Sequence, residues 1–143
     1  MVQVGGEPWL IDVGFGGNGL LEPIPLAAGT RARQYSEEFR LTALESHEYL
    51  LQSLVHDEWE SLYSFTLEPC QPVDYQYPNY FHSHSFESRF MQRRVCTIPT
   101  RDGRKTLVDQ SLSIRRNGKS EKSVADSDAA YARLLQEHFG IVL

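Results

Sequence analysis

The sequence predicts an α+β fold that is mostly antiparallel β-structure. In the first half of the chain, short apolar and aromatic runs alternate with polar turns, a spacing typical of a small barrel or curled sheet. Two prolines within residues 68–72 (Glu-Pro-Cys-Gln-Pro) indicate a boundary. An amphipathic helical pattern then lies near the C-terminus. These observations divide the chain into a β-domain, residues 1–71, and a mixed domain of helices and strands, residues 72–143.

The first half is expected to begin with a hairpin around Gly5-Gly6, whose second strand covers residues 8–13. Four glycines within residues 14–19 then exclude regular structure and permit unusual backbone angles. Two further prolines, at positions 23 and 25, keep the next segment extended and loop-like. Three strands are predicted after it, at residues 38–44, 48–55 and 58–67.

The second half is expected to open with a short helix, which Asp74 can cap. Three aromatic residues recur at helical spacing in this helix: Tyr77, Tyr80 and Phe81. Residues 88–98 and 105–114 then indicate a hairpin around residues 101–104, because Asp-Gly is a strong turn signal.

A further turn and a helix are predicted at the end of the chain. The turn is Asn117-Gly118, and the helix covers residues 128–138. Either Asp126 or Ser127 can cap the start of the helix, and Gly140 is suited to end it.

Composition and charge narrow the class of protein. Of 143 residues, 41% are hydrophobic, which excludes a wholly disordered chain, and no apolar run approaches the ~20 residues of a membrane span. The N-terminus lacks the pattern of a signal peptide, so we expect a soluble, cytoplasmic protein with no membrane partner. Residues 1–74 hold 12 acidic and 3 basic side chains, whereas residues 75–143 hold 7 and 11.

Ten of the 14 lysines and arginines lie between residues 89 and 122. Such a cluster is either an anion-binding face or an ordinary solvated hairpin. Nucleic acid is not the expected partner, because the pI of 5.5 is far below the ~9 typical of nucleic-acid-binding domains. A phosphorylated small molecule is still a candidate partner for this basic cluster.

The strongest candidate for chemistry is Asp12, which lies in the apolar run Leu-Ile-Asp-Val before the glycine-rich stretch. A carboxylate in apolar surroundings is costly unless a histidine, an arginine or backbone amides pair with it, so we expect Asp12 to be substantially buried and paired. One role for such an acid is to orient the imidazole of a catalytic triad. The adjacent glycines would offer amides to an oxyanion or a phosphate. The alternative is a purely structural turn.

These residues resemble the arylamine N-acetyltransferases. Asp-Val-Gly-Phe-Gly-Gly at residues 12–17 is similar to the triad-aspartate motif of that family. The resemblance continues through Pro-Ile-Pro-Leu at 23–26, Gln34, the Trp-x-x-Leu-Tyr-x-Phe strand at 59–65 and an Asp…Asn-x-x-x-Ser-x-Ser-x-x-Ser-x-Phe segment ending at Phe90. The match extends to Leu134 and to Phe-Gly-Ile at 139–141, in the family's order over nearly the whole chain.

The resemblance implies a fold of the cysteine-protease-like superfamily, with a helical bundle, a β-barrel and an α/β lid. It implies acetyl transfer from acetyl-CoA to an arylamine or hydrazine through a Cys-His-Asp triad. Asp12 would be the triad acid. Three residues, Phe15, Gly16 and Gly17, would lie beside the acetyl group and acceptor, and another three, Ser83, His84 and Ser85, near the CoA or acceptor channel.

Of the triad, the resemblance matches only Asp12 in this chain. The family's cysteine lies in the N-terminal bundle and its histidine one strand before the aspartate, so an N-terminally truncated chain is expected. Cys70 lies in the proline-flanked linker and Cys96 in a predicted strand beside two arginines, which could lower its pKa; a thiol without a role is the favoured interpretation. His82 and His84 have no further partner at metal-ligand spacing, so no metal is expected.

The sequence therefore predicts the barrel and lid of an acetyltransferase-like protein that is inactive as this chain alone. Self-association, or a complementing N-terminal chain, would then cover apolar surface left exposed. Two alternatives remain: a non-catalytic module that binds CoA or another phosphorylated ligand, and a glycine-rich loop that binds the carboxylate of a peptide C-terminus.

Overall fold

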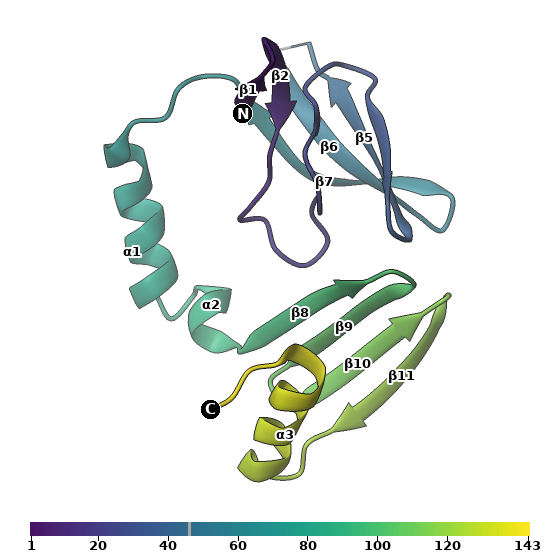
Figure 1. Cartoon of the computed structure of the whole chain (residues 1–143). Coiled ribbons are helices and arrows are strands. Elements are labelled where there is room, and N and C mark those ends of the chain that lie inside the picture. Colours follow the sequence, from purple (N-terminus) through teal and green to yellow (C-terminus); the bar gives the residue numbers. More distant parts are fainter. Residues whose placement is uncertain (46) are drawn as a thin grey trace. The chain divides into compact units, whose positions relative to one another are not determined.

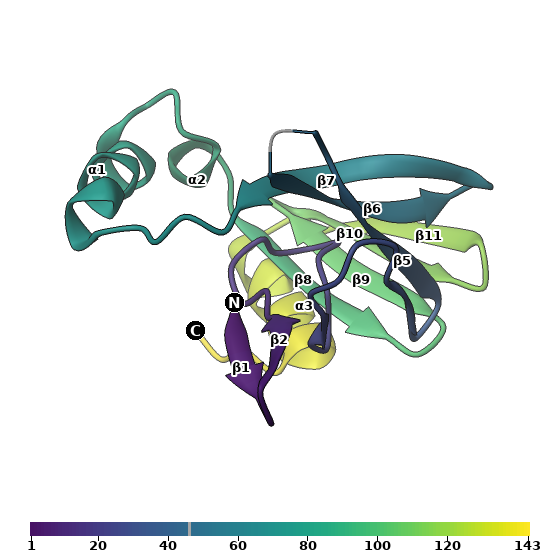
Figure 2. The same ribbon diagram turned by 90° about the horizontal axis from the view of Figure 1, so that it is seen from above.

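The computed structural model describes residues 1–45 and 47–143. The chain forms two compact units, Met1–Glu68 and Pro69–Leu143, and each is described by itself. Figure 1 shows the order of the elements along the chain, and Figure 2 shows the same elements from above. Among the described residues, no helix is both long enough and apolar enough to cross a bilayer.

Unit 1 consists of two antiparallel sheets, one of three strands and one of four. The first has the order β1-β2-β3 and the second the order β4-β5-β6-β7. The strands are β1 (Val2–Val4), β2 (Glu7–Leu10), β3 (Ile24–Pro25), β4 (Arg31–Gln34), β5 (Glu37–Ala43), β6 (Glu48–Val55) and β7 (Glu58–Thr66). Strands β4 and β7 are the two edges of the four-stranded sheet and do not pair with each other, so the described residues form an open sheet and not a closed barrel.

The core of unit 1 lies between its two sheets. Phe39, Leu41 and Leu51 on the four-stranded sheet are fully buried. They pack with apolar side chains from β2, β3 and the flanking segments: Leu10, Leu20, Ile24 and Leu26. The long loop that leaves β2 and returns at β3, visible in Figure 1, is therefore attached to this core at both ends.

Unit 2 combines a helical segment with a sheet and a covering helix. The helical segment contains a 3-10 turn (Pro72–Tyr75), α1 (Gln76–His84) and α2 (Arg89–Gln92). The antiparallel sheet has the order β11-β10-β9-β8. Its strands are β8 (Val95–Thr100), β9 (Gly103–Val108), β10 (Ser111–Arg116) and β11 (Lys119–Val124). Helix α3 (Asp128–Phe139) lies against one face of this sheet (Figures 1 and 2), where Tyr131 and Leu135 pack on Leu107 and Leu112.

The caps of α3 agree with the sequence-based expectation. The Ser127 hydroxyl accepts a hydrogen bond from the Ala130 N–H at 3.2 Å. At the other end, Gly140 has a φ of 71°, the left-handed conformation that glycine adopts without a steric cost. The predicted turns at Gly5-Gly6 and Asn117-Gly118 also have positive φ angles at all four residues.

Two strand predictions in unit 2 are wrong in extent. Residues 88–98 do not form one strand, because Ser88 begins the short helix α2 and β8 starts only at Val95. Residues 105–114 do not form one strand either. Asp109, with a φ of 52°, turns the chain between β9 and β10, so that Val108 pairs with Ser111.

Candidate functional site

The carboxylate of Asp12 forms hydrogen bonds with the backbone at the start of the loop that follows β2. Its Oδ1 accepts hydrogen bonds from the backbone N–H of Gly14 at 3.1 Å and of Phe15 at 3.0 Å. This is the local pattern by which an aspartate side chain folds its own backbone into a turn. Its Oδ2 faces the other way and accepts a hydrogen bond from the Tyr63 hydroxyl at 2.9 Å. The pairing expected for Asp12 is thus supplied by backbone amides and by a phenol.

Tyr63 holds Asp12 from the neighbouring sheet. It lies on β7, and its ring packs against the ring of Phe15, with 4.7 Å between centroids. Burial raises the pKa of Tyr63 far above its ordinary value, and the hydrogen bond to Asp12 and the negative charge of Asp12 raise it further. The phenol therefore stays protonated and remains a hydrogen-bond donor throughout the physiological pH range.

A hollow of about 190 Å³ opens beside this carboxylate. Its lining consists of Asp12, Val13, Gly14, Gly16, Gly19 and Leu20. At Gly19 a side chain has no room, because a Cβ would lie 2.8 Å from Asp12 Oδ2. Gly16 has a φ of 97°, which a residue with a side chain rarely adopts. The glycines thus leave the backbone and the carboxylate open to a small ligand.

The end of the same loop is tied by Gln34, a side chain only 7% exposed on β4. Its Oε1 accepts hydrogen bonds from the N–H groups of Leu21 at 2.6 Å and Glu22 at 3.0 Å. Its Nε2 donates to the Glu22 carbonyl at 2.8 Å. The resemblance matched Gln34 without a role, and the pairing of Tyr63 with Asp12 was not foreseen. Tyr63 lies on a predicted strand, and Gln34 lies on a strand that only the structure shows. A polar side chain within a strand is the sequence signal that could have indicated a role for each of these two residues.

The strand predicted over residues 8–13 is too long, and the substantial burial expected for Asp12 is only partial. Asp12 is only half-buried, Val13 is 94% exposed, and β2 ends at Leu10 rather than at Val13. The reason is the Asx turn, which bends the backbone away from the sheet as soon as Asp12 has been reached. Of the other residues expected around the site, Phe15 and Gly16 lie in this turn and loop, and Gly17 follows them without lining the hollow.

The second group of expected site residues lies together in unit 2, at the end of α1. The Ser83 hydroxyl donates to the Asn79 carbonyl at 2.6 Å and lies 2.7 Å from Nδ1 of His84. The same Nδ1 lies 3.2 Å from the Tyr80 carbonyl, which can only accept. We therefore assign the proton of neutral His84 to Nδ1, which leaves Nε2 as an exposed acceptor.

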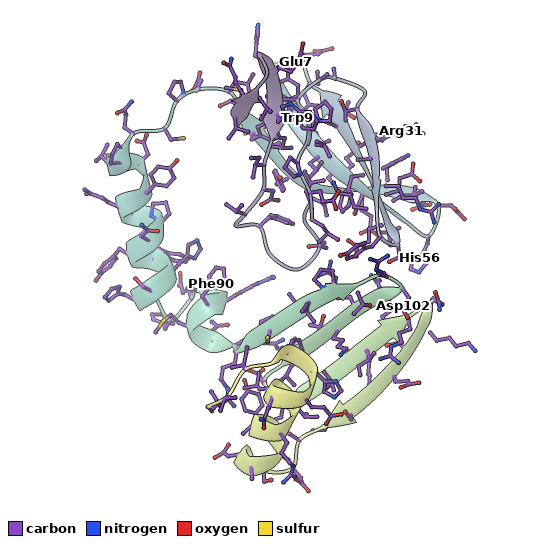
Figure 3. All side chains as sticks on the ribbon, viewed as in Figure 1. Glu7, Trp9, Arg31, His56, Phe90 and Asp102 are labelled. Atoms are coloured by element: carbon purple, nitrogen blue, oxygen red, sulfur yellow. The ribbon has the colours of Figure 1, made fainter. Side chains whose placement is uncertain are left out.

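Ser85 and Ser88 shape the turn after α1. Ser85 Oγ accepts from the Glu87 N–H at 3.2 Å. Ser88 is only 1% exposed, and its hydroxyl lies 3.3 Å from the His82 carbonyl and 3.4 Å from His82 Nδ1. The His82 ring in turn meets the edge of Phe90, which Figure 3 labels beside α2. The backbone N–H of Ser88 donates to the Ser85 carbonyl at 3.0 Å, so the chain turns here and enters α2 where a strand was predicted.

Within the part of the chain that the structure describes, neither cysteine is among the residues that line the Asp12 hollow. Cys70 is exposed in the linker region of unit 2, and Cys96 is half-buried on β8. Burial raises the pKa of the Cys96 thiol, which makes it less reactive. Within residues 1–45 and 47–143, no three histidine, cysteine or acidic side chains gather closely enough to hold a metal ion.

Comparison with known proteins extends these observations. A family model described as N-acetyltransferase matches residues 1–143. An arylamine N-acetyltransferase of Mycolicibacterium smegmatis is 34% identical over 135 residues, which are 94% of this chain and 49% of the relative. The structure of the Salmonella typhimurium arylamine N-acetyltransferase has a TM-score of 0.85 and 30% identity, over 96% of this chain and 51% of that one.

A third comparison includes a ligand. The structure of the Mycobacterium marinum arylamine N-acetyltransferase in complex with CoA is 33% identical and has a TM-score of 0.82, over 94% of this chain and 49% of that one. The chain thus spans about half the length of the relatives that it matches.

Proposed function

Because the chain belongs to the arylamine N-acetyltransferase family, we propose that it carries the acid of a Cys-His-Asp acetyl-transfer triad, and that this acid is Asp12. The observation that supports this role most directly is the division of labour between the two carboxylate oxygens. Oδ1 accepts hydrogen bonds from two backbone amides and Oδ2 accepts one from the Tyr63 hydroxyl, while the Asp12 side chain is part of the lining of the hollow. A carboxylate fixed in this way can orient an imidazole and stabilise the imidazolium that forms during proton transfer.

In the proposed reaction a cysteine thiolate attacks the thioester of acetyl-CoA and CoA leaves as a thiol. The amine of an arylamine or hydrazine then attacks the acetyl-cysteine, and the imidazole takes the proton of the amine. Asp12 touches only the imidazole in this scheme. Phe15, Gly16 and Gly17 would border the acetyl group and the acceptor, which is consistent with the open backbone beside the carboxylate.

The chain alone is proposed to be inactive as an acetyltransferase. Among the described residues, no histidine or cysteine lines the hollow beside Asp12. The thiol and the imidazole would therefore have to come from a further polypeptide segment, corresponding to the half of the relatives that this chain does not match.

Complementation tests this proposal. The chain is mixed with the unmatched half of the M. smegmatis relative, and acetylation of a hydrazide by acetyl-CoA is measured. We expect activity in the mixture only, and a loss of at least about a hundredfold in Asp12→Asn, since the carboxylate that orients the imidazole is then missing. Asp57→Asn, in an exposed turn of the same unit, is the matched control and should leave activity unchanged.

Two outcomes would contradict the proposal. Hydrolysis of acetyl-CoA by the purified chain alone, abolished in Asp12→Ala, would refute the predicted inactivity. Equal activity of the Asp12→Asn and Asp57→Asn mixtures would refute the role of Asp12.

We further propose that the basic part of unit 2 meets the phosphates of CoA. Its support is the concentration of ten of the 14 lysines and arginines within residues 89–122, and the CoA complex of the M. marinum relative. Ser83, His84 and Ser85 would lie along the same channel, with the exposed Nε2 of His84 as a hydrogen-bond acceptor.

Calorimetry with CoA tests the phosphate contact. The charge is reversed separately in Arg93→Glu and in Arg94→Glu. Arg93→Glu is the more informative of the two, because the Arg94 guanidinium lies 4.3 Å from the centroid of the Tyr131 ring and its loss would also disturb packing. Unchanged CoA affinity in both Arg93→Glu and Arg94→Glu would refute the contact. If the chain binds CoA but the complementation mixture shows no acetyltransferase activity, the alternative of a non-catalytic binding module is favoured.

A further inference from the structure

The three basic residues of the acidic first half gather on one face of one sheet. Unit 1 contains only Arg31, Arg33 and Arg40 as lysines or arginines. The register places all three on the face of the β4–β7 sheet that is opposite to the buried Phe39. In a segment with so strong an acidic excess, such a grouping creates a local positive surface.

Trp59 lies on the same face, and its ring contacts two of these arginine side chains. The guanidinium carbon of Arg40 is 4.4 Å from the centroid of the Trp59 ring, and that of Arg31 is 5.4 Å from it. Both distances are within the range of a cation–π contact. The two positive groups are therefore held next to the same indole, and Figure 3 labels Arg31 at the surface of this sheet.

Arg40 is further fixed by a buried amide. Its Nε donates to Oε1 of Gln52 at 2.7 Å, and Gln52 is only 8% exposed although it lies on the face opposite to the core. The amide of Gln52 is oriented by Ser61, whose Oγ accepts from its Nε2 at 3.4 Å. Because this hydrogen bond uses only Nε, it leaves the N–H donors of the two terminal Nη groups of Arg40 for an additional partner.

The arrangement is electrostatically unfavourable as it stands. Arg31 and Arg40 are directly opposite each other on neighbouring strands, and like charges in this position destabilise a sheet. Arg33, by contrast, is opposite Glu38, which offsets its charge. Arg31 and Arg40 both contact the Trp59 indole, and Arg40 also donates to the Gln52 amide; these partners are uncharged.

We propose that Arg31, Arg40 and Trp59 form a binding site for an oxyanion group, a carboxylate or a phosphate. Such a group would take hydrogen bonds from both guanidinium groups, whose planar forks match its oxygens, and would remove the repulsion between them. The site lies on the face of the sheet opposite to the core that anchors the Asp12 loop, so the proposal does not depend on the acetyl-transfer function.

Fluorescence of Trp59 provides a direct test. In a Trp9→Phe background Trp59 is the only tryptophan. We titrate this protein with inorganic phosphate and separately with benzoate, and use sodium chloride to keep the ionic strength constant. A saturable change in the Trp59 emission is expected with at least one of the two anions, and the effective anion identifies the group that the site prefers.

Matched arginine variants show whether the three named residues carry the binding. Arg31→Ala should weaken it roughly tenfold, because one of two charge-assisted contacts is lost. Arg33→Ala removes one positive charge from the same strand and the same face, but this arginine is not one of the two that contact the Trp59 ring. The affinity of Arg33→Ala for the anion should therefore stay within about twofold of the unmodified value. Arg40→Lys should also weaken binding, since an ammonium cannot reproduce the planar fork.

Calorimetry on the unmodified chain repeats the titration without altering Trp9, and thermal unfolding confirms that each variant is folded. The proposal is overturned if neither anion produces a saturable response. It is equally overturned if Arg31→Ala and Arg33→Ala weaken binding to the same extent, because the attraction would then be diffuse and not a site.

Discussion

The hydrogen bond between Tyr63 and Asp12 should have a measurable effect on the stability of unit 1. Tyr63→Phe removes the hydroxyl that lies 2.9 Å from Asp12 Oδ2 but keeps the ring that packs against Phe15. A hydrogen bond to a charged group contributes roughly 1.5–3 kcal/mol, and since Asp12 is half-buried and keeps its two amide donors, we expect a loss near the low end, about 1.5 kcal/mol.

The chain supplies both the probe and the control for this experiment. Both tryptophans, Trp9 and Trp59, lie in unit 1, so their fluorescence during urea unfolding follows this unit alone. Tyr49→Phe removes a hydroxyl from the same aromatic cluster, where Tyr49 stacks on Phe65 with 5.6 Å between centroids. This control should change the free energy of unfolding by less than about 0.5 kcal/mol. Equal effects of the two substitutions would refute the reasoning.

The same pair predicts a pH dependence at alkaline pH. Folding raises the pKa of Tyr63 above its ordinary value of 10.0, through burial first and Asp12 second. The contribution of this group to stability is therefore complete below about pH 10 and declines as the pH rises from there toward the folded-state pKa. The stability difference between the unmodified chain and Tyr63→Phe, measured in urea at several pH values, should be constant up to about pH 9 and shrink at higher pH. A difference that grows above pH 10 would contradict the assignment.

Two further predictions concern single sites. Gly19→Ala should destabilise unit 1 by about 1–3 kcal/mol in the same fluorescence assay, because the added Cβ would lie 2.8 Å from Asp12 Oδ2, whereas Gly14→Ala, with open space around its Cβ, should be nearly neutral. Iodoacetamide at pH 8 should modify the exposed Cys70 well before Cys96, whose pKa is raised by burial, and mass spectrometry of the modified peptides would detect the opposite order if it occurred.

Local signals in the sequence were sufficient for the turns at Gly5-Gly6 and Asn117-Gly118 and for α3. Asn117-Gly118 and the caps Ser127 and Gly140 are determined by the conformational preferences of those residues themselves, and the structure confirms them. Strand β4 was not predicted, because Arg31–Gln34 carries arginines on one face and a buried glutamine on the other, which removes the apolar alternation. The turn at Asp109 was missed because no glycine or proline accompanies its positive φ.

The candidate site was predictable in part for a similar reason. An aspartate within an apolar run predicted that Asp12 needs partners, and its amide donors are only two and three residues away. Its third partner, Tyr63, is 51 residues away along the chain. Tertiary packing alone brings these two residues together, and no local pattern in one sequence contains that information.

A β-bulge explains why one strand serves two sites on opposite faces of its sheet. Strict alternation would place Trp59, Ser61 and Tyr63 on the same face. The register instead pairs Ser61 with Gln52 and Tyr63 with the adjacent Leu51, so that Leu62 is the extra residue on β7. An extra residue reverses the facing of every side chain that follows it. Trp59 therefore stays with the arginines outside the core, while Tyr63 turns inward and reaches Asp12. Both proposed sites thus depend on the same irregularity of β7, because a regular strand would remove either the donor of Asp12 or the indole between the arginines.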